Sequence, residues 1–216
     1  MAGVIDRLIG SDGSLYTASF GTALATGTAT SGSWYKIATV SGVATFPAGY
    51  EVGDLVLGNG QTFNAGNTAA LATFTSVADC TSFSFDVSAD EVEVTVLGDS
   101  VKKFRKGKSD FSGTIEGINF ISEMRKASSF INRFIRTVVA TSANVATLQP
   151  KSTAALYGKF FLNDSTASGE TQVFLFGQIE IFGAKLGAAV GDVQSYSSGV
   201  RFTGDADPML YFLDNA

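Results

Sequence analysis

The stretch Val92-Glu93-Val94-Thr95-Val96-Leu97, which ends at Gly98-Asp99, decides the fold class. Apolar and polar residues alternate along it, and a period of two turns one set of side chains to a buried face and the other to a polar face. The same alternation runs through Thr81–Val87 and, more weakly, through Ser112–Ile118. We therefore predict that these three segments are half-buried β-strands.

Further strands are predicted on both sides of this stretch. β-Branched and aromatic residues bounded by glycine and proline are typical of strands, and they occur at 34–40, 43–46, 50–57, 159–162, 171–182 and 199–203. Residues 10–33 and 58–70 are instead rich in small or polar residues, which bury little surface by themselves. We expect 10–33 to be a long flexible loop, or an arm that orders on a neighbour, and 58–70 to be a second loop.

One segment, from Ser122 to about Ala140, has a helical pattern. Its apolar residues recur at helical spacing and fall on one side of a helix, with four basic residues opposite. Ser122 is a suitable N-cap. We expect an amphipathic helix that covers a sheet with its charges in water. A position on a membrane surface is the alternative, which the acidic remainder of the chain disfavours.

The order of strands, one helix and more strands indicates the architecture. It predicts a mainly β fold, a β-sandwich or β-barrel with one amphipathic α-helix packed on it. No internal repeat and no clean boundary interrupts the chain, and all-β chains of this length are routinely one domain. We therefore expect residues 1–216 to form a single domain.

The composition excludes several kinds of chemistry. The chain has no His and one Cys, which excludes a His-based triad, a His metal ligand, an intrachain disulfide and a Cys-based zinc site. The sequence has neither a long apolar run nor a signal-peptide pattern, so we expect no transmembrane helix and folding in a reducing cytosol. A net charge of −5 argues against gripping nucleic acid.

The motifs for catalysis and for cofactor binding are weak. Glu91 and Glu93 lie on one side of a strand, which usually means a solvated face, and the single Cys80 is typical of a small buried apolar residue. The glycine-rich segments have neither the Lys-Ser/Thr of a P-loop nor the spacing of a dinucleotide-binding loop. We expect no enzyme activity, no cofactor and no metal.

Charge is segregated along the chain. All eight charged residues from Ile37 to Val101 are acidic, whereas 102–136 holds nine basic and three acidic residues. Two interpretations remain open. The signs either mix on the folded surface, or a basic face meets an acidic face on another copy and sets the register of association. A head-to-tail contact of the second kind closes into rings or continues as a filament.

The residues from Glu91 to Gly117 resemble the tail tube proteins (major tail proteins) of long-tailed bacteriophages. In that family a V-x-V-T-x-x-G-D strand leads into a K-x-x-x-G-x-x-D turn and an S-G-T/S-x-x-G strand. This chain has Val92-Glu93-Val94-Thr95-Val96-Leu97-Gly98-Asp99, Lys103-Phe104-Arg105-Lys106-Gly107-Lys108-Ser109-Asp110 and Ser112-Gly113-Thr114-Ile115-Glu116-Gly117. Residues 174–182 and 197–204 are similar to the closing strands of the family, and the resemblance covers about a third of the chain.

The resemblance implies a structural protein of the virion tail. Its subunits would form hexameric rings, made in the host bacterial cytoplasm, that stack into a tube with an inner β-barrel shared between subunits. Tape-measure, tail-tip and tail-terminator proteins would be its partners, and DNA would pass through the lumen without specific binding. A shared barrel would also remove exposed strand edges.

Two sets of residues follow as hypotheses from this family and from strand parity. An acidic channel wall would repel DNA phosphates, and the polar sides of the alternating strands supply its candidates: Glu91, Glu93, Thr95, Thr114, Glu116, Gln178 and Glu180. The candidates for contacts with an acidic neighbouring subunit are the basic run Lys102, Lys103, Arg105, Lys106 and Lys108. The alternatives to a tube subunit are a capsid-decoration or tail-fibre module and a carbohydrate-binding sandwich.

Overall fold

The computed structural model describes most of the chain as β-strands. The described residues are 6–10, 12–24, 26–40, 50–63, 66–93, 104–120, 130–134, 137–142, 145–149, 153–165, 167–187, 193–203 and 208–214. The strands are β1 (Asp6–Gly10), β2 (Asp12–Leu24), β3 (Gly27–Thr28), β4 (Trp34–Thr39), β5 (Leu55–Leu57), β6 (Thr62–Phe63), β7 (Thr68–Glu93), β8 (Phe104–Phe120), β9 (Thr137–Ser142), β10 (Val145–Gln149), β11 (Leu156–Asn163), β12 (Thr171–Gly187), β13 (Val193–Phe202) and β14 (Met209–Asp214). The predicted mainly β fold is confirmed.

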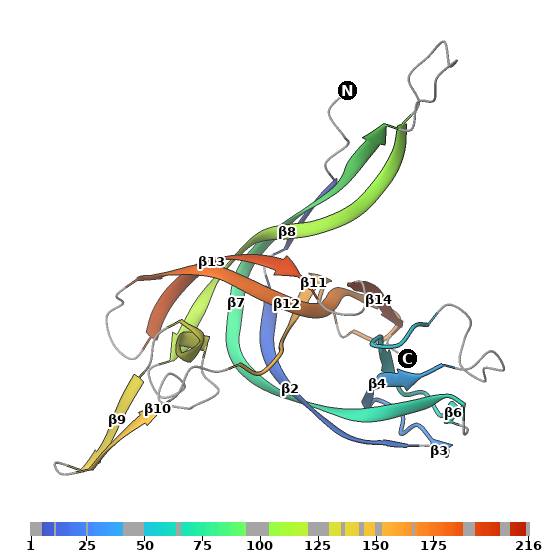
Figure 1. Cartoon of the computed structure of the whole chain (residues 1–216), viewed down its shortest axis with the longest axis horizontal. Coiled ribbons are helices and arrows are strands. Elements are labelled where there is room, and N and C mark those ends of the chain that lie inside the picture. Colours follow the sequence, from blue (N-terminus) through green and yellow to red (C-terminus); the bar gives the residue numbers. More distant parts are fainter. Residues whose placement is uncertain are drawn as a thin grey trace.

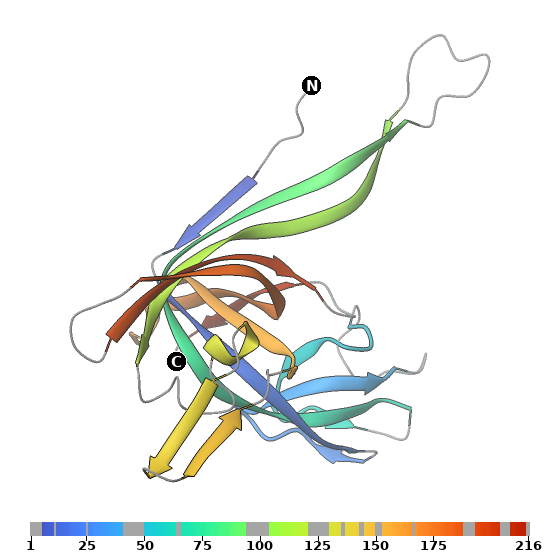
Figure 2. The same ribbon diagram turned by 60° about the vertical axis from the view of Figure 1, so that its left-hand side comes forward.

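Ten of these strands form one antiparallel sheet whose pairings return to their starting point. The order β2-β11-β12-β13-β8-β7 is followed by a further pairing of β7 with β2. Strands β1 and β4 pair with β7, β5 pairs with β4, and β14 pairs with β12. Figures 1 and 2 show these strands curving around one another. Segments from both halves of the chain therefore share one hydrogen-bonded sheet.

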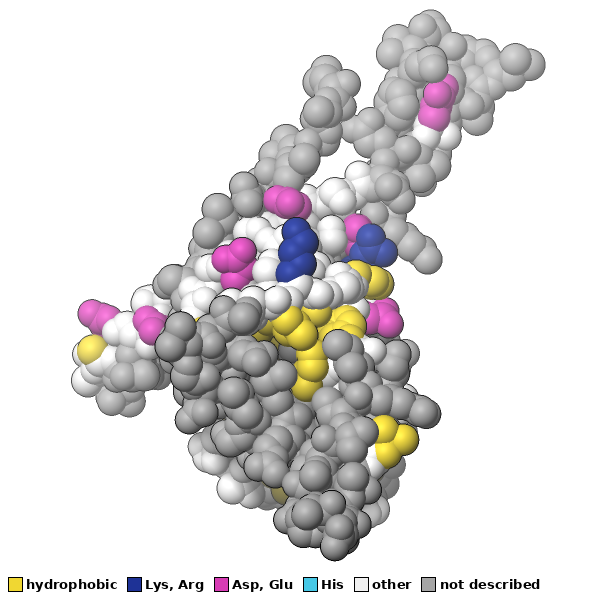
Figure 3. Space-filling model, turned by 90° about the vertical axis from the view of Figure 1, so that its left-hand side faces the viewer, with side chains coloured by type: hydrophobic (Ala, Val, Ile, Leu, Met, Phe, Trp, Pro, Cys, Tyr) yellow, Lys and Arg dark blue, Asp and Glu magenta, His cyan; other side chains and the backbone are white. Residues whose placement is uncertain are grey.

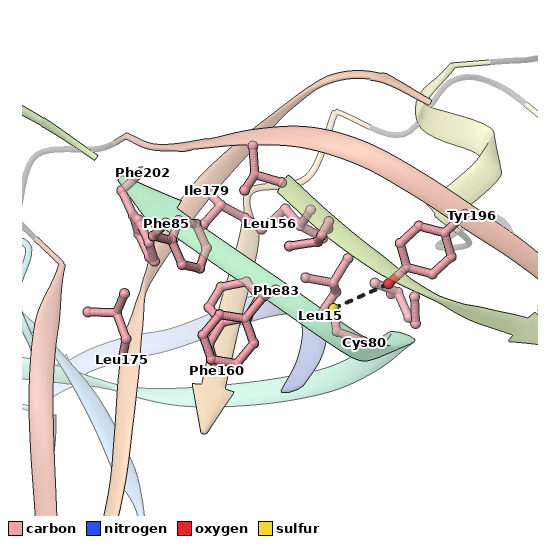
Figure 4. Packing of buried hydrophobic residues seen from close by; sticks show 14 residues of the cluster. Leu15, Cys80, Phe83, Phe85, Leu156, Phe160, Leu175, Ile179, Tyr196 and Phe202 are labelled. Carbon is pink, nitrogen blue, oxygen red and sulfur yellow. Dashed lines mark hydrogen bonds between the residues drawn. The ribbon is translucent and has the colours of Figure 1, made fainter. Parts of the chain in front are cut away.

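The largest core cluster lies inside this circuit of six strands. Each strand contributes at least one buried residue: Leu15 from β2, Phe83 and Phe85 from β7, Ile115 from β8, Leu156 and Phe160 from β11, Leu175 and Ile179 from β12, and Tyr196, Val200 and Phe202 from β13. Figure 4 shows the aromatic rings gathered together between these strands. The ring centroids of Phe85 and Phe160 are 4.8 Å apart. Alternate residues of the strands thus fill the space that the circuit encloses.

A second aromatic layer packs on the outer side of β11 and β12. Trp34 of β4 meets Phe176 at 4.9 Å and Tyr211 of β14 at 5.0 Å, both as edge-to-face pairs. Tyr211 stacks on Phe174 at 5.3 Å and donates a hydrogen bond to the carbonyl oxygen of Leu55. This layer explains why Phe174, Leu175 and Phe176 are all apolar: both faces of β12 are buried at these residues.

Residues 12–24 form a strand, although 10–33 was expected to be a loop or an arm. Strand β2 pairs with β11 along one edge and with β7 along the other. Its large core side chain is Leu15, which is fully buried, and a Cβ on Gly13 would lie 2.9 Å from the carbonyl oxygen of Lys159. Small residues serve here because two neighbouring backbones approach closely. The second expected loop, 58–70, also ends early, because β7 begins at Thr68.

The predicted helix over 122–140 is wrong in its described part. Residues Phe130–Arg133 form a short 3₁₀ turn, in which the Phe134 amide donates to the Ile131 carbonyl, and Thr137–Ser142 is strand β9, paired with β10. The β-branched residues of Thr137-Val138-Val139 favour a strand, where their side chains are less crowded. Ile131 is buried and Phe134 packs against the core inside the circuit. Residues 121–129 lie outside the described residues.

Strands β7 and β8 extend well beyond the rest of the sheet. Their pairing continues to Glu93 and Phe104, whereas β13 stops pairing with β8 at Ser112 and β1 stops pairing with β7 at Val87. Residues 88–93 and 104–110 therefore form a two-stranded ribbon, which we name the arm. Figures 1 and 2 show it projecting away from the body of the molecule.

Candidate functional site

Four residues predicted to line a channel lie on one face of the sheet. Thr114 and Glu116 belong to β8, Gln178 and Glu180 belong to β12, and β13 lies between these strands. The β13 partners of Thr114, Glu116 and Glu180 are Gly199, Ser197 and Arg201, respectively. Because directly opposed residues share a face, these side chains project from the same surface. Gln178 is two residues from Glu180 and shares its side of the strand.

We name this surface the polar face. It comprises Ser82, Ser84 and Asp86 of β7, Asp110, Ser112, Thr114 and Glu116 of β8, Ser197, Gly199 and Arg201 of β13, and Gln178, Glu180, Lys185 and the exposed Phe182 of β12. The intervening residues, such as Ile115 and Ile179, point into the core. Thr114, Glu116 and Glu180 are exposed. The polar face is therefore the solvated outside of a sheet whose inside is filled.

Side chains of the polar face bridge neighbouring strands. The Ser82 hydroxyl donates to the Glu116 carboxylate at 3.3 Å, and the Ser84 and Thr114 hydroxyls are 3.1 Å apart. At the border with the second aromatic layer, Tyr157 donates to the Gln178 side-chain oxygen at 3.5 Å. Apart from the exposed Phe182, these short polar side chains make the surface hydrophilic.

The polar face carries an excess of acidic groups. Its carboxylates are Asp86, Asp110, Glu116 and Glu180, and its cations are Lys185 and Arg201. Arg201 Nε lies 3.1 Å from Asp110 Oδ1, and its guanidinium carbon lies 5.6 Å from the ring centre of Phe182. Figure 3 shows another view of the described surface, on which single acidic and basic side chains stand among uncharged ones.

Two of the other predicted channel residues, Glu91 and Glu93, belong to the arm. Glu91 and Glu93 lie near the end of β7, whose last residue is Glu93, and Glu93 is exposed. Thr95 lies outside the described residues. The structure therefore brings together four of the seven candidates and leaves two of the others along the arm.

One residue of the basic run lies opposite an acidic residue of the same chain. Arg105, Lys106 and Lys108 belong to β8, and Lys102 and Lys103 lie outside the described residues. The backbone register sets Lys106 opposite Glu91 and Arg105 opposite Val92. Opposite charges that are separate in the sequence are thus carried by the two strands of one hairpin. An experiment on these lysines must account for this pairing.

Residues that the sequence reasoning missed also contribute to the polar face. Ser82, Ser84 and Asp86 alternate with the buried Phe83 and Phe85. Strand parity could therefore have identified Asp86. Arg201 and Asp110 form an ion pair only because β13 and β8 are neighbours. No spacing in the sequence signals that pairing.

The described residues also include the lining of a cavity beside the polar face. Among them, no three His, Cys, Asp or Glu side chains lie together as metal ligands would. A cavity of about 390 Å³ is lined by residues that include Arg133, Gln178 and Glu180. The Arg133 Nη2 donates to the Ala154 carbonyl at 2.6 Å, and burial lowers the pKa of its guanidinium. A hydroxyl in this cavity has no imidazole as a base, because the chain contains no His.

The single cysteine is part of the core. Cys80 Sγ lies 3.3 Å from the Tyr196 hydroxyl, which also donates to the Asp79 carbonyl at 3.1 Å. Figure 4 shows the Cys80–Tyr196 contact at one end of the core cluster. The thiol is buried, so the expectation of a small buried residue is met.

Two buried tyrosines predict a loss of stability in alkali. Burial raises the pKa of Tyr196, with further contributions from Cys80 and Asp79, and burial beside Tyr50 and Asp54 raises the pKa of Tyr211. Above the ordinary value of 10.0 the unfolded chain releases these protons while the folded chain keeps them. The free energy of unfolding should therefore fall as the pH rises above about 10.

Chemical unfolding at a series of pH values, with tyrosinate absorbance followed in parallel, measures this effect. Tyr196→Phe should make the alkaline loss of stability smaller than in the unmodified protein. Full ionisation of all six tyrosines near pH 10 in the folded protein would contradict the expectation.

The comparisons with known proteins add no relative. Searches against family models, curated proteins and solved structures find no match to this chain. The described residues also contain no helix with the length and hydropathy needed to cross a membrane.

Proposed function

We propose that this chain is a structural subunit of a bacteriophage tail tube, in which stacked hexameric rings form the conduit for DNA. The observation that carries the proposal is the polar face. It is a broad, mainly hydrophilic surface with an excess of acidic groups, formed by the four neighbouring strands β7, β8, β13 and β12. A surface of this kind suits the wall of a channel through which a polyanion slides.

The filled core supports a channel between subunits rather than inside one. We infer that the closed circuit of six strands is a small β-barrel, because a barrel of few strands is filled by its own side chains. Phe85, Phe160 and Phe174 are fully buried in or against it. DNA therefore has no path through a single subunit, and a lumen requires several polar faces arranged in a ring.

The electrostatics of the polar face suit passage rather than binding. DNA-binding surfaces neutralise phosphates with Lys and Arg and thereby gain affinity through counterion release. Here four carboxylates outnumber two cations, and one of the cations, Arg201, already pairs with Asp110. Mutual repulsion would keep the DNA backbone from adhering to the wall.

The arm supports association with a neighbouring subunit. A two-stranded ribbon is at best marginally stable in water without further packing, so packing against a neighbouring subunit would stabilise the arm. Tape-measure, tail-tip and tail-terminator proteins are the further partners that this function requires. The virion tail is then the location of the protein, after assembly in the bacterial cytoplasm.

Negative-stain electron microscopy of the purified protein, over a range of concentrations and with added tail-tip complex, tests the proposed function. We expect hollow rods or hexameric rings, and a high-resolution map of the rods should place Glu116 and Glu180 on the channel wall. A dispersed monomer under every condition would overturn the proposal. Discrete oligomers without a channel would favour a capsid-decoration or tail-fibre module.

Exchange of charges across the arm tests the basic run separately. The double variant Glu91→Lys/Lys106→Glu keeps opposite charges facing each other within the hairpin and keeps the net charge. If Lys106 docks on an acidic neighbour, this variant should fold normally and form far fewer rods than the unmodified protein. Glu51→Lys, exposed beside the turn at Val52 and in neither the arm nor the polar face, is the control for a simple change of charge. Rods of normal number from the double variant would refute docking through Lys106.

A further inference from the structure

Most free strand edges of the molecule carry devices that prevent unwanted pairing. Charged side chains and very short strands are the usual protections of an edge. Strand β1 has Asp6 and Arg7, the arm has charges on both strands, and β5 has three residues. In the described part of the chain the β9–β10 hairpin lacks both protections, and β14 carries one charge at its end, Asp214, whose carboxylate accepts a hydrogen bond from the Thr171 hydroxyl.

Strand β14 presents an edge that is uncharged from Met209 to Leu213. Among the described residues it pairs with β12 alone. Leu210 and Phe212 are 45% and 64% exposed, which makes Phe212 the most exposed of the large apolar side chains described. The opposite side of the strand is held firmly, since Tyr211 stacks on Phe174 and bonds to Leu55. The edge is therefore rigid as well as apolar.

The β9–β10 hairpin is the second element with an unpartnered edge. Its strands pair with each other and with no other described strand. From Thr137 to Gln149 the sequence contains no charged residue and no proline, and Leu148 is 52% exposed. Figures 1 and 2 show the hairpin projecting from the body of the molecule, and in Figure 1 it lies on the opposite side from β14. Its separation from β14 means that the two cannot meet within one chain as folded.

We propose that the β10 edge of one copy adds to the β14 edge of the next copy, so that Leu148 is buried against Leu210 and Phe212. The two strands match in length, with five and six residues. Thr137–Gln149 and Met209–Leu213 contain no charged residue, so pairing these stretches, with Asp214 left at the open end of β14, removes exposed apolar area without burying a charge. Edge-to-edge strand addition also satisfies the free backbone groups of both strands.

This contact is head to tail, because the two surfaces are different parts of one molecule. A contact of that kind leaves one free β10 and one free β14 on every pair, and therefore continues until it closes into a ring or extends as a filament. The inference rests on the proposed function in one respect: repeated association of this kind is what a tube requires. The contact itself can be tested without rods.

Disulfide trapping between two differently tagged variants tests the contact. Leu148→Cys and Phe212→Cys are mixed under mild oxidation, and Cys80 does not compete because it is 1% exposed. The 148–212 heterodimer should exceed the 148–148 and 212–212 homodimers several-fold on a non-reducing gel. Val52→Cys is the control for Phe212→Cys, because Val52 lies in a turn and is 52% exposed. Equal yields of all dimers, or no dimer, would overturn the contact.

The variant Phe212→Lys separates this inference from the proposed function. A charge on an edge strand blocks strand addition, so this variant should fold as the unmodified protein does and form few or no rods, while Val52→Lys forms them normally. Rods of normal number from Phe212→Lys would disprove the β10–β14 contact and leave the tube proposal standing. A strong 148–212 cross-link in a protein that never forms rods would support the β10–β14 contact and disprove the tube proposal.

Discussion

Alanine at position 113 is expected to destabilise the folded monomer by about 3 kcal/mol or more, the upper range for overpacking a core. Gly113 belongs to the S-G-T-x-x-G strand of β8 and is the cross-strand partner of Phe85 in β7. A Cβ at this position would overlap the carbonyl oxygen of Ser84 and would lie 2.9 Å from the Cα of Phe85. Backbone atoms cannot rotate away as a side chain can, so the two strands would have to separate.

Chemical unfolding in dilute solution measures the loss, with Gly21→Ala as the matched control. Gly21 is also in a strand, β2, but the nearest atom to its added Cβ is the Leu71 carbonyl oxygen at an ordinary 3.7 Å. Gly21→Ala should change the free energy of unfolding by less than about 1 kcal/mol. Similar values for the two variants would show that close approach of β7 and β8 is not the reason for glycine at 113.

Truncation of Phe85 to alanine should cost about 3–5 kcal/mol, as is typical for a large aromatic residue in a core. Phe85 is fully buried, and its ring centre lies 4.8 Å from that of Phe160, 5.0 Å from that of Phe202 and 5.8 Å from that of Phe83. Removing the ring leaves a cavity among three other rings and weakens the contact between β7, β11 and β13. A loss of this size is a large fraction of the stability of most domains.

Phe182→Ala is the control for this truncation, because Phe182 is 52% exposed and lies on the outside of β12. Its truncation should cost less than about 1 kcal/mol in the monomer. If Phe85→Ala does not fold, Phe85→Leu should fold with an intermediate loss, since it retains part of the buried volume. Equal losses for positions 85 and 182 would contradict a core enclosed by the circuit of strands.

The alternation of residues predicted the parts of the fold that depend on local pattern. Phe83 and Phe85 alternate with Ser82, Ser84 and Asp86, and the structure buries the first set and leaves the second on the polar face. Parity also placed Thr114 with Glu116 and Gln178 with Glu180. Strand geometry explains this success, because the period of two is a property of the extended backbone and needs no knowledge of neighbours.

Local pattern failed where distant segments decide the conformation. Strand β2 has few large apolar residues, and it is ordered by pairing with β11 and β7 on its two edges. Thr137–Ser142 fits a helical wheel but pairs with β10 instead. Cross-strand hydrogen bonds between segments outweigh weak intrinsic propensities, and a helical wheel does not include such bonds.

Residue order alone was sufficient for the fold class, for the sidedness of the strands and for the exclusion of histidine chemistry, because composition and the pleat of a strand are local properties. The tertiary structure decided the rest: the pairing of β7 with β2 that closes the circuit, the pairing of β8 and β12 with β13 that gathers the polar face, and the register that sets Lys106 opposite Glu91. These depend on which strands become neighbours. That choice minimises exposed apolar surface and unpaired backbone over the whole chain at once, and no short stretch of sequence contains it.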